Sequence, residues 1–210
     1  MKALITVAIA DLWNEIEKGR ETQLLQGEKI EVIKEAGEWL YVSALEQERF
    51  TKEQGWHPYP GWLRRSTVEF VESFPSSNSS QAPLDLNQLI TDAERFLHIP
   101  YLWGGRSREG IDCSALNHLI FQAQGFSIPR DAHDQYLKCE KIDREQLRSG
   151  DLIFFTPREK PTRITHVVLY KEKGWCIEAP ETGKLVSYLS KEGLEEKERK
   201  YRLSFGRFQR

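Results

Sequence analysis

The first third of the chain alternates apolar and polar residues in short runs. Residues 5–13, 23–45 and 60–66 carry β-branched and aromatic side chains at alternate positions, which is the period of half-buried β-strands. Glycine residues interrupt these runs where turns are expected. The pattern predicts a small β-barrel over residues 1–70.

The first ten residues, MKALITVAIA, allow two interpretations. One lysine before a short apolar run that ends in Ala8-Ile9-Ala10 is similar to an export signal with its cleavage site. The run is short, however, and Ile5, Val7 and Ile9 alternate as they would in a strand. We favour a first β-strand and a cytoplasmic location, with a periplasmic or secreted protein as the alternative.

The period of the pattern changes in the next part of the chain. Residues 71–84 are rich in serine and proline and have no hydrophobic period, which predicts a linker. Over residues 86–99 apolar positions recur three and four apart, after a favourable N-cap type at Asp85 and before Pro100. We therefore expect a helix there.

A second helix is expected to begin at Cys113. Apolar residues recur at helical spacing over residues 113–123. Asp112 is a good N-cap type, and Gly125 stands where a C-terminal cap is expected.

Three apolar runs that follow this helix read as strands, at residues 152–155, 166–170 and 175–180. A helix followed by antiparallel strands predicts an α+β domain over residues 85–210. The charged stretch 191–200 is interpreted as a solvated face.

Composition narrows the possible functions. The 210 residues carry a formal net charge of −2, which excludes the basic footprint of a nucleic-acid-binding protein. No apolar run approaches the roughly 20 residues that cross a bilayer. The three cysteines have no CxxC spacing and the five histidines form no HExxH motif. We therefore expect neither a disulfide framework nor a bound metal or cofactor.

Cys113 is the candidate nucleophile. A cysteine in the first turn of a helix lies at the positive end of the helix dipole, which favours its thiolate form. The carboxylate of Asp112 beside it opposes the thiolate, so a base and the dipole must outweigh that charge. The alternative is a small buried core residue, which is the interpretation for Cys139 and Cys176.

A nucleophilic cysteine needs a base, and the base needs a group that orients its ring. His166 opens a predicted strand after a loop, where its side chain can reach a cleft. Glu178 lies on the next strand of a hairpin, and facing side chains of paired strands come within about 5.5 Å. Glu178 is therefore a candidate acceptor for the His166 imidazole. The alternatives are a strand-end histidine satisfied by the backbone and a solvent-exposed glutamate.

Five short motifs occur in the order and approximate spacing of one family: Tyr101-Leu102-Trp103-Gly104-Gly105, Asp112-Cys113-Ser114, Pro129-Arg130, Gly150-Asp151-Leu152 and His166-Val167. Residues 86–210 thereby resemble the NlpC-type bacterial cell-wall cysteine peptidases. Residues 1–70 have Gly27-Glu28 before a predicted strand, Gly37-Glu38-Trp39 in a predicted turn and Tyr59-Pro60-Gly61-Trp62 near their end, and with these motifs they resemble a bacterial SH3-like domain. The resemblance implies a papain-like fold. It also implies hydrolysis, without a cofactor, of the bond between γ-D-glutamate and meso-diaminopimelate or L-lysine in peptidoglycan stem peptides.

The resemblance implies roles for single residues as well. Cys113 would be the nucleophile and His166 the general base. Tyr101 matches a tyrosine that lines the site and can donate a hydrogen bond to the oxyanion. Asp112 and Ser114 flank the nucleophile at positions that contact substrate, where Asp112 can pair with the free amine of an N-terminal L-alanine.

The chain departs from the family at the third catalytic position. A histidine or a neutral polar residue is usual there, and here the match falls on Glu178. Because a carboxylate can also orient an imidazole, we expect an active enzyme in which His166 is more basic than in its relatives. Its expected substrates are short peptides with a free N-terminal L-alanine.

Three further points stay open at the level of sequence. A catalytically decayed cell-wall binding module is an alternative, as is a cysteine acyltransferase or amidase on the same frame. Arg130 is expected to tie down the loop after the helix rather than to bind a substrate carboxylate. Arg106 is expected to be solvated.

Overall fold

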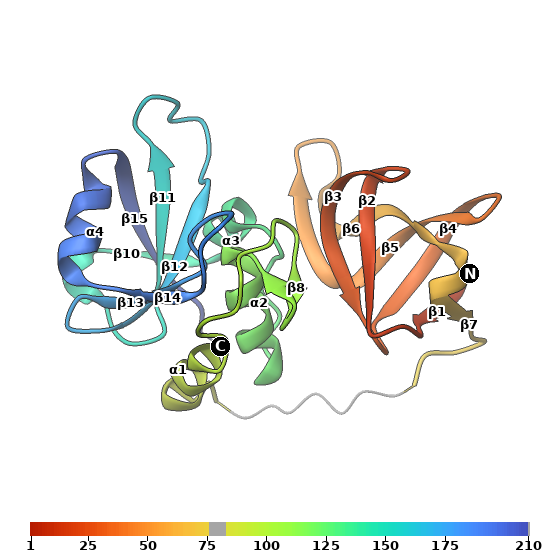
Figure 1. The fold of residues 1–210 in the computed structure, drawn as a ribbon, viewed down its shortest axis with the longest axis horizontal. Coiled ribbons are helices and arrows are strands. Elements are labelled where there is room, and N and C mark those ends of the chain that lie inside the picture. The colour runs from red at the N-terminus through yellow and green to blue at the C-terminus, as the bar shows by residue number, and fades with distance from the viewer. Residues whose placement is uncertain (76–82, 210) are drawn as a thin grey trace. The chain divides into compact units, whose positions relative to one another are not determined.

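The computed structural model describes residues 1–75 and 83–209. The central part of the predicted linker, residues 76–82, lies outside the described residues. The described chain divides into two compact units (Figure 1). Unit 1 comprises residues 1–75 together with Trp103–Ser107, and unit 2 comprises residues 83–102 and 108–209.

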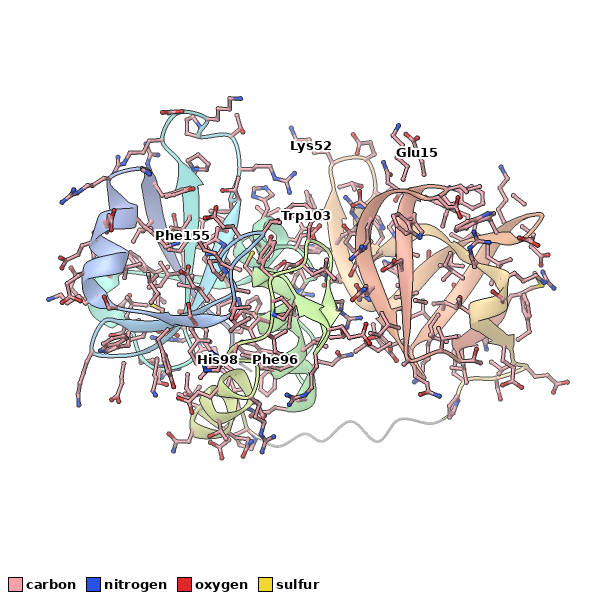
Figure 2. The ribbon with its side chains drawn as sticks, viewed as in Figure 1. Glu15, Lys52, Phe96, His98, Trp103 and Phe155 are labelled. Carbon is pink, nitrogen blue, oxygen red and sulfur yellow. The ribbon has the colours of Figure 1, made fainter. Side chains whose placement is uncertain are left out.

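Unit 1 contains a seven-stranded antiparallel sheet among its described residues, in the order β3-β2-β6-β5-β4-β1-β7. Its inward side chains, among them Leu12, Leu24 and Leu63, are fully buried in one apolar cluster. Glu15 and Lys52 lie at the ends of strand hairpins with exposed side chains (Figure 2). The strands are β1 (Lys2–Ile5), β2 (Ile9–Glu15), β3 (Lys18–Leu25), β4 (Lys29–Ala36), β5 (Trp39–Thr51), β6 (Gly55–Arg64) and β7 (Val68–Phe70), with a 3-10 turn at Arg65–Thr67 and the short β8 (Arg106–Ser107).

The expected N-terminal strand is present, divided in two. β1 lies between β4 and β7 and buries Ala3 and Ile5. A bend at residues 6–8 separates it from β2. The alternation of apolar residues therefore reflects a sheet with one buried face.

The expectation that Arg106 is solvated is wrong. Arg106 is fully buried in unit 1 and donates from Nη1 to the Gln23 carbonyl at 2.8 Å and to Glu28 Oε2 at 3.0 Å. Burial of a guanidinium is tolerated because a carboxylate and a carbonyl replace its hydration. Its partners lie far away in sequence, so the local polar pattern around Arg106 gave no sign of them.

Unit 2 contains a six-stranded antiparallel sheet among its described residues, in the order β10-β15-β11-β12-β13-β14. With its helices, this sheet confirms the expected α+β class. The elements are α1 (Leu86–Glu94), β9 (Gly110–Ile111), α2 (Cys113–Ala123), α3 (Ala132–Lys138), β10 (Glu140–Ile142), a 3-10 turn at Arg144–Gln146, β11 (Leu152–Pro157), β12 (His166–Glu172), β13 (Trp175–Glu178), β14 (Ser187–Leu189), α4 (Lys191–Glu198) and β15 (Tyr201–Arg207). No helix in the described ranges combines the length and apolar character needed to span a bilayer.

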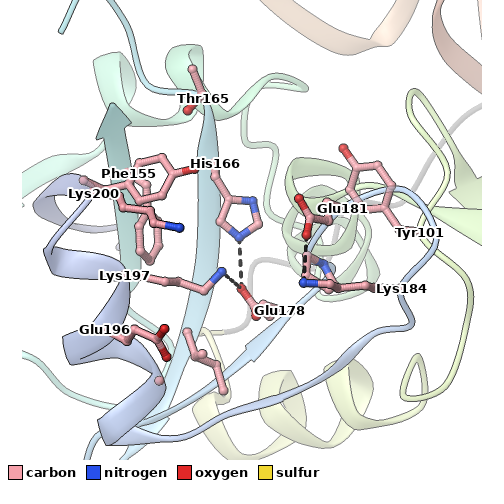
Figure 3. Close-up of a pocket in the computed structure, with 14 residues that line it drawn as sticks. Tyr101, Phe155, Thr165, His166, Glu178, Glu181, Lys184, Glu196, Lys197 and Lys200 are labelled. Atoms are coloured by element: carbon pink, nitrogen blue, oxygen red, sulfur yellow. Dashed lines mark hydrogen bonds and ion pairs between the residues drawn. The ribbon is translucent and has the colours of Figure 1, made fainter. Parts of the chain in front are cut away.

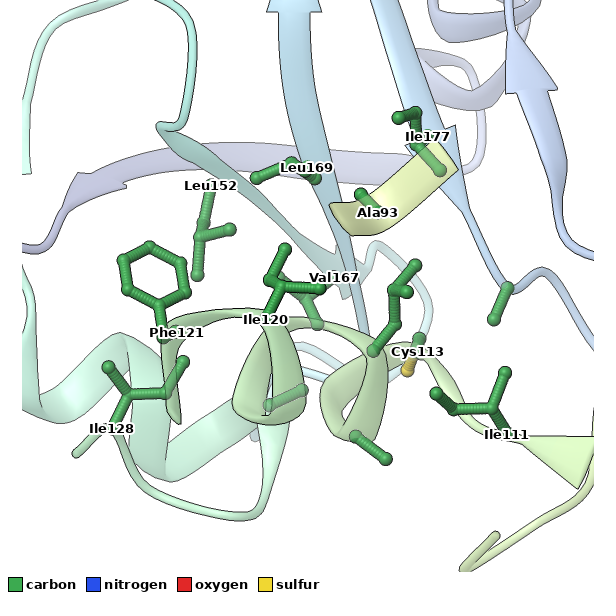
Figure 4. Packing of buried hydrophobic residues seen from close by; sticks show 14 of the residues in the cluster. Ala93, Ile111, Cys113, Ile120, Phe121, Ile128, Leu152, Val167, Leu169 and Ile177 are labelled. Carbon is green, nitrogen blue, oxygen red and sulfur yellow. The ribbon is translucent and has the colours of Figure 1, made fainter. Parts of the chain in front are cut away.

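The core of unit 2 lies between α2 and the sheet. Ile120 and Phe121 on α2 are buried in the same cluster as Leu152 of β11 and Val167 of β12 (Figure 4). Burying side chains of this size contributes about 1.5–3 kcal/mol each. This packing fixes the start of α2, which carries Cys113, relative to the strand that begins with His166.

Two helices of unit 2 differ in detail from the sequence pattern. α1 ends at Glu94, earlier than the expected limit of residue 99, because the next amides bond three residues back and His98 takes a φ of 69°. The charged stretch 191–200 forms α4, which begins at the Ser190 N-cap and buries Leu194. The expected turn at Lys173-Gly174 is present, with both residues at positive φ.

Candidate active site

Cys113 occupies the first position of α2, as the sequence pattern predicts. Asp112 is the N-cap, and its Oδ1 accepts from the amide of Ala115 at 2.8 Å. Cys113 is 7% exposed, at the edge of the core (Figure 4). The thiol therefore lies at the positive end of the helix dipole with limited access to solvent.

Arg130 binds the N-cap of this helix through a buried bidentate ion pair. Its Nη2 donates to Asp112 Oδ2 at 2.7 Å and its Nη1 to Asp112 Oδ1 at 3.0 Å. Nη1 also donates to Ser114 Oγ at 2.9 Å. Arg130 thus ties the segment after α2 to the start of α2. Its positive charge offsets the Asp112 carboxylate, which by itself would oppose a thiolate at Cys113.

His166 at the start of β12 and Glu178 at the end of β13 are hydrogen-bonded. His166 Nε2 lies 3.1 Å from Glu178 Oε2, and both side chains are mostly buried (Figure 3). Because Nε2 is engaged with Glu178, Nδ1 is the ring nitrogen left for Cys113. The imidazole also packs on the Phe155 ring, with 5.3 Å between ring centroids. The expected contact is therefore present, but the register that pairs Leu169 with Ile177 places Glu178 diagonally from His166, two positions away, and not directly opposite it.

The charges around His166 favour its protonated form. Burial lowers the pKa of His166, but the charge of Cys113, a hydrogen bond with Cys113 and the contact with Glu178 outweigh burial and raise it to about 9. Burial raises the pKa of Glu178, whereas its bond to His166 and the charge of Lys197 hold it below its usual value. At neutral pH the pair is therefore an imidazolium and a carboxylate.

Tyr101 lines the same cavity as His166 and Glu178, a hollow of about 530 Å³. Burial, with the charges of Cys113 and Asp112, raises the pKa of Tyr101 well above its usual value. The phenol consequently keeps its proton and can act as a hydrogen-bond donor. Its backbone is fixed by the amide, which donates to the Lys184 carbonyl at 2.9 Å.

The cavity also contains a residue that sequence reasoning missed. Lys197 of α4 places Nζ 3.0 Å from Glu178 Oε2 (Figure 3). Within residues 191–200 the single apolar residue is Leu194, and a residue three positions later shares its face of a helix. That spacing is the signal by which Lys197 can be found.

The structure brings the predicted site residues together in two adjoining groups. Tyr101, His166 and Glu178 line the cavity. Asp112 and Ser114 belong to the buried cluster with Arg130 at the start of α2. The charge of Cys113 is among the causes that raise the pKa of His166. The catalytic and substrate-binding roles of these residues stay predictions.

Comparison with known proteins gives consistent matches. The model of the NlpC/P60 family matches residues 98–202. A γ-D-glutamyl-L-lysine dipeptidyl-peptidase of Bacillus subtilis is 30% identical in sequence to this chain. The alignment covers 81% of this chain and 75% of that protein. An enzyme of the same name from Bacillus cereus is 34% identical in sequence. That alignment covers 61% of this chain and 37% of the relative.

Among solved structures, a crystal structure of an NlpC/P60 family protein from Bacillus cereus superposes with a TM-score of 0.85. The match covers 99% of both chains at 21% sequence identity. At this identity the likeness concerns the fold, and it includes both units.

Proposed function

The chain belongs to the NlpC/P60 family, and we propose that it is a cysteine peptidase that cleaves the bond between γ-D-glutamate and a diamino acid in peptidoglycan stem peptides. The observation that carries this proposal is a cysteine at a helix start with a histidine whose second nitrogen is held by a carboxylate. The names of two relatives, γ-D-glutamyl-L-lysine dipeptidyl-peptidases, support this bond and the release of a dipeptide.

In the first half of the reaction, Cys113 and His166 act as a thiolate and an imidazolium. The sulfur attacks the γ-carbonyl carbon of D-glutamate, and the carbonyl electron pair moves to oxygen. When the tetrahedral intermediate collapses, the C–N bond breaks and His166 Nδ1 gives its proton to the leaving amine. The products are the free diamino acid and a thioester on Cys113.

In the second half, the now neutral His166 takes a proton from water. The oxygen of that water attacks the thioester carbon, and the C–S bond breaks to restore the thiolate. The imidazolium is restored in the same cycle, and the carboxylic acid that leaves gives its proton to solvent. Glu178 holds the ring in one orientation through both steps.

The negative oxygen of the intermediates needs donors that keep their protons. The Tyr101 hydroxyl meets this need, because its raised pKa keeps it protonated. The amide of Cys113 at the start of α2 is a second donor of the same kind. We assign both to the oxyanion.

Recognition of a free N-terminal L-alanine is assigned to the start of α2. The Asp112 carboxylate is buried and already oriented by Arg130 and by the Ala115 amide, so it is preorganised for a substrate amine. Ser114 shares the same cluster. Acetylation of the amine removes its charge and is expected to lower kcat/KM by about 30- to 1,000-fold.

The test is incubation of the full chain with L-Ala-γ-D-Glu-meso-diaminopimelate and with its L-lysine counterpart. Release of L-Ala-γ-D-Glu is followed by mass spectrometry beside Cys113→Ala and beside the N-acetylated peptides. The proposal requires product from the wild type and none from Cys113→Ala. Equal rates with free and acetylated peptides would remove the assignment of Asp112.

Iodoacetamide distinguishes the reasons for a negative result. Burial raises the pKa of Cys139, and it raises that of Cys176 to about 12, so alkylation at pH 7 is expected at Cys113 alone. No product together with an unreactive Cys113 would favour a binding module. No product with a reactive Cys113 would point to a different acyl substrate.

A further inference from the structure

One oxygen of Glu178 is shared by two cationic groups. Glu178 Oε2 lies 3.1 Å from His166 Nε2 and 3.0 Å from Lys197 Nζ. The Glu178 side chain is 8% exposed and that of Lys197 is 28% exposed. A carboxylate this buried needs a positive charge beside it to stay ionised. Lys197 supplies that charge whenever the His166 ring is neutral.

The fold delivers Lys197 to this point by specific packing. Leu194, one turn earlier on α4, is 4% exposed and lies in the same cluster as Phe155. The Ser190 side chain caps α4 by accepting from the Gly193 amide at 3.2 Å. Lys197 Nζ lies 5.8 Å from the centroid of the Phe155 ring, the ring on which His166 also packs. Phe155 thus supports both partners of Glu178.

Other charged or titratable groups also face this point. Cys113 approaches His166 from α2, and Tyr101 lines the cavity from the segment after α1. Glu181 and Lys184 pair with each other at 2.7 Å on the segment after β13. The remaining groups that line the cavity are Glu196 of α4, Lys200 and Tyr201. Lys197 differs from the other lysines of the cavity in its contact with Glu178.

We propose that Lys197 is a positioning residue that holds the Glu178 carboxylate against His166 and offsets part of its charge, so that the imidazole can give up its proton during catalysis. This inference rests on the proposed function. With two cations on one oxygen, the carboxylate attracts the imidazolium proton less strongly than it would alone. A histidine that kept its proton too firmly would not become the neutral base that thioester hydrolysis requires.

The direct test measures the protonation of His166 without substrate. The imidazole C–H resonances are titrated by NMR in the wild type, Lys197→Met, Lys197→Arg and Lys191→Met, and His166 is identified by its absence in His166→Asn. Lys197→Met is expected to raise the His166 midpoint by about half to one pH unit, and Lys197→Arg to leave it near the wild-type value. Lys191→Met removes the same charge from an exposed site on the same helix and is expected to leave it unchanged.

The kinetic counterpart is a slower deacylation. In Lys197→Met, kcat at pH 7 should fall by about three- to tenfold, which is the factor that corresponds to the shift in midpoint, and it should recover as the pH is raised. The thioester should then be visible by intact-protein mass spectrometry. A purely structural role would lower kcat at every pH, with no recovery.

The outcomes separate this inference from the proposed function. If Lys197→Met shifts the His166 midpoint while the wild type cleaves no stem peptide, the role of Lys197 is upheld and the substrate assignment is overturned. Cleavage by the wild type together with an unmoved midpoint in a folded Lys197→Met would overturn the role of Lys197. Circular dichroism establishes that the variant is folded.

Discussion

At the scale of the residue, Glu178 decides how firmly His166 holds its proton. Glu178→Gln keeps the shape but removes the negative charge that helps to raise the pKa of His166. The His166 midpoint should fall from about 9, and kcat/KM should fall by about 10²- to 10⁴-fold because the imidazolium loses its partner. NMR titration and peptide kinetics measure the two effects, with the exposed Glu195→Gln as control. An unchanged midpoint would mean that Cys113 alone sets the basicity of His166.

The raised pKa of His166 also fixes one limb of the pH profile. A histidine whose pKa is raised in the folded protein stays an imidazolium below that value and loses the proton as the pH passes it. The imidazolium form of His166 should therefore persist through pH 7 and 8, and kcat/KM should decline above a pH of about 9. Rates of dipeptide release between pH 6 and 10.5 measure this. A decline centred near 6.5 would show that the environment of His166 does not favour its protonated form.

At the scale of the element, local signals were predictable and long-range partners were not. Asp85 and Asp112 cap α1 and α2 with their side chains, as their residue types and the following periods predict. The strand order needed for the His166–Glu178 contact followed from one hairpin. The sequence pattern predicts solvated charges at Lys197 and Arg106. The prediction fails because each pairs with a carboxylate that only the tertiary fold brings near.

The start of α2 carries a stability prediction of its own. Arg130→Met leaves the Asp112 carboxylate buried without its guanidinium, and loss of one partner of a buried pair costs about 3–5 kcal/mol. Arg130→Lys keeps the charge but not the bidentate geometry, so its loss should be smaller. Urea unfolding measures both. The matched control is Arg95→Met. Arg95 pairs with Asp92 and has 61% of its side chain exposed, so its loss is expected to change the free energy of unfolding by about 1 kcal/mol or less. Equal losses in Arg130→Met and Arg95→Met would contradict the prediction.

At the scale of the whole molecule, sequence order and spatial grouping differ at one segment. Trp103–Ser107 follows the first helix of unit 2 in sequence and belongs to unit 1 in space. Composition and period separate residues 1–70 from 85–210, because each range builds an apolar cluster of its own. Composition and hydrophobic period do not predict that Trp103–Ser107 belongs to unit 1, because this short segment makes a few polar contacts there and contains no hydrophobic run.

Those contacts make the last prediction. Arg106 Nη1 lies 2.9 Å from Glu28 Oε1 and donates to the Gln23 carbonyl, and its side chain has no exposed area. Arg106→Met should therefore destabilise unit 1 by about 3–5 kcal/mol, because Glu28 is left as a buried charge without its cation.

Tryptophan fluorescence can follow this loss, since all of the tryptophans except Trp175 lie in unit 1. Arg65→Met, which removes an ion pair of the same unit from a site about half exposed, is the control and should change stability by about 1 kcal/mol or less. If the double variant Arg106→Met with Glu28→Gln regains most of the lost stability, the cost lies in the unpaired carboxylate. If it regains none, the cost lies in the lost packing of the arginine side chain and its bond to Gln23, and the buried charge is not what holds Trp103–Ser107 in unit 1.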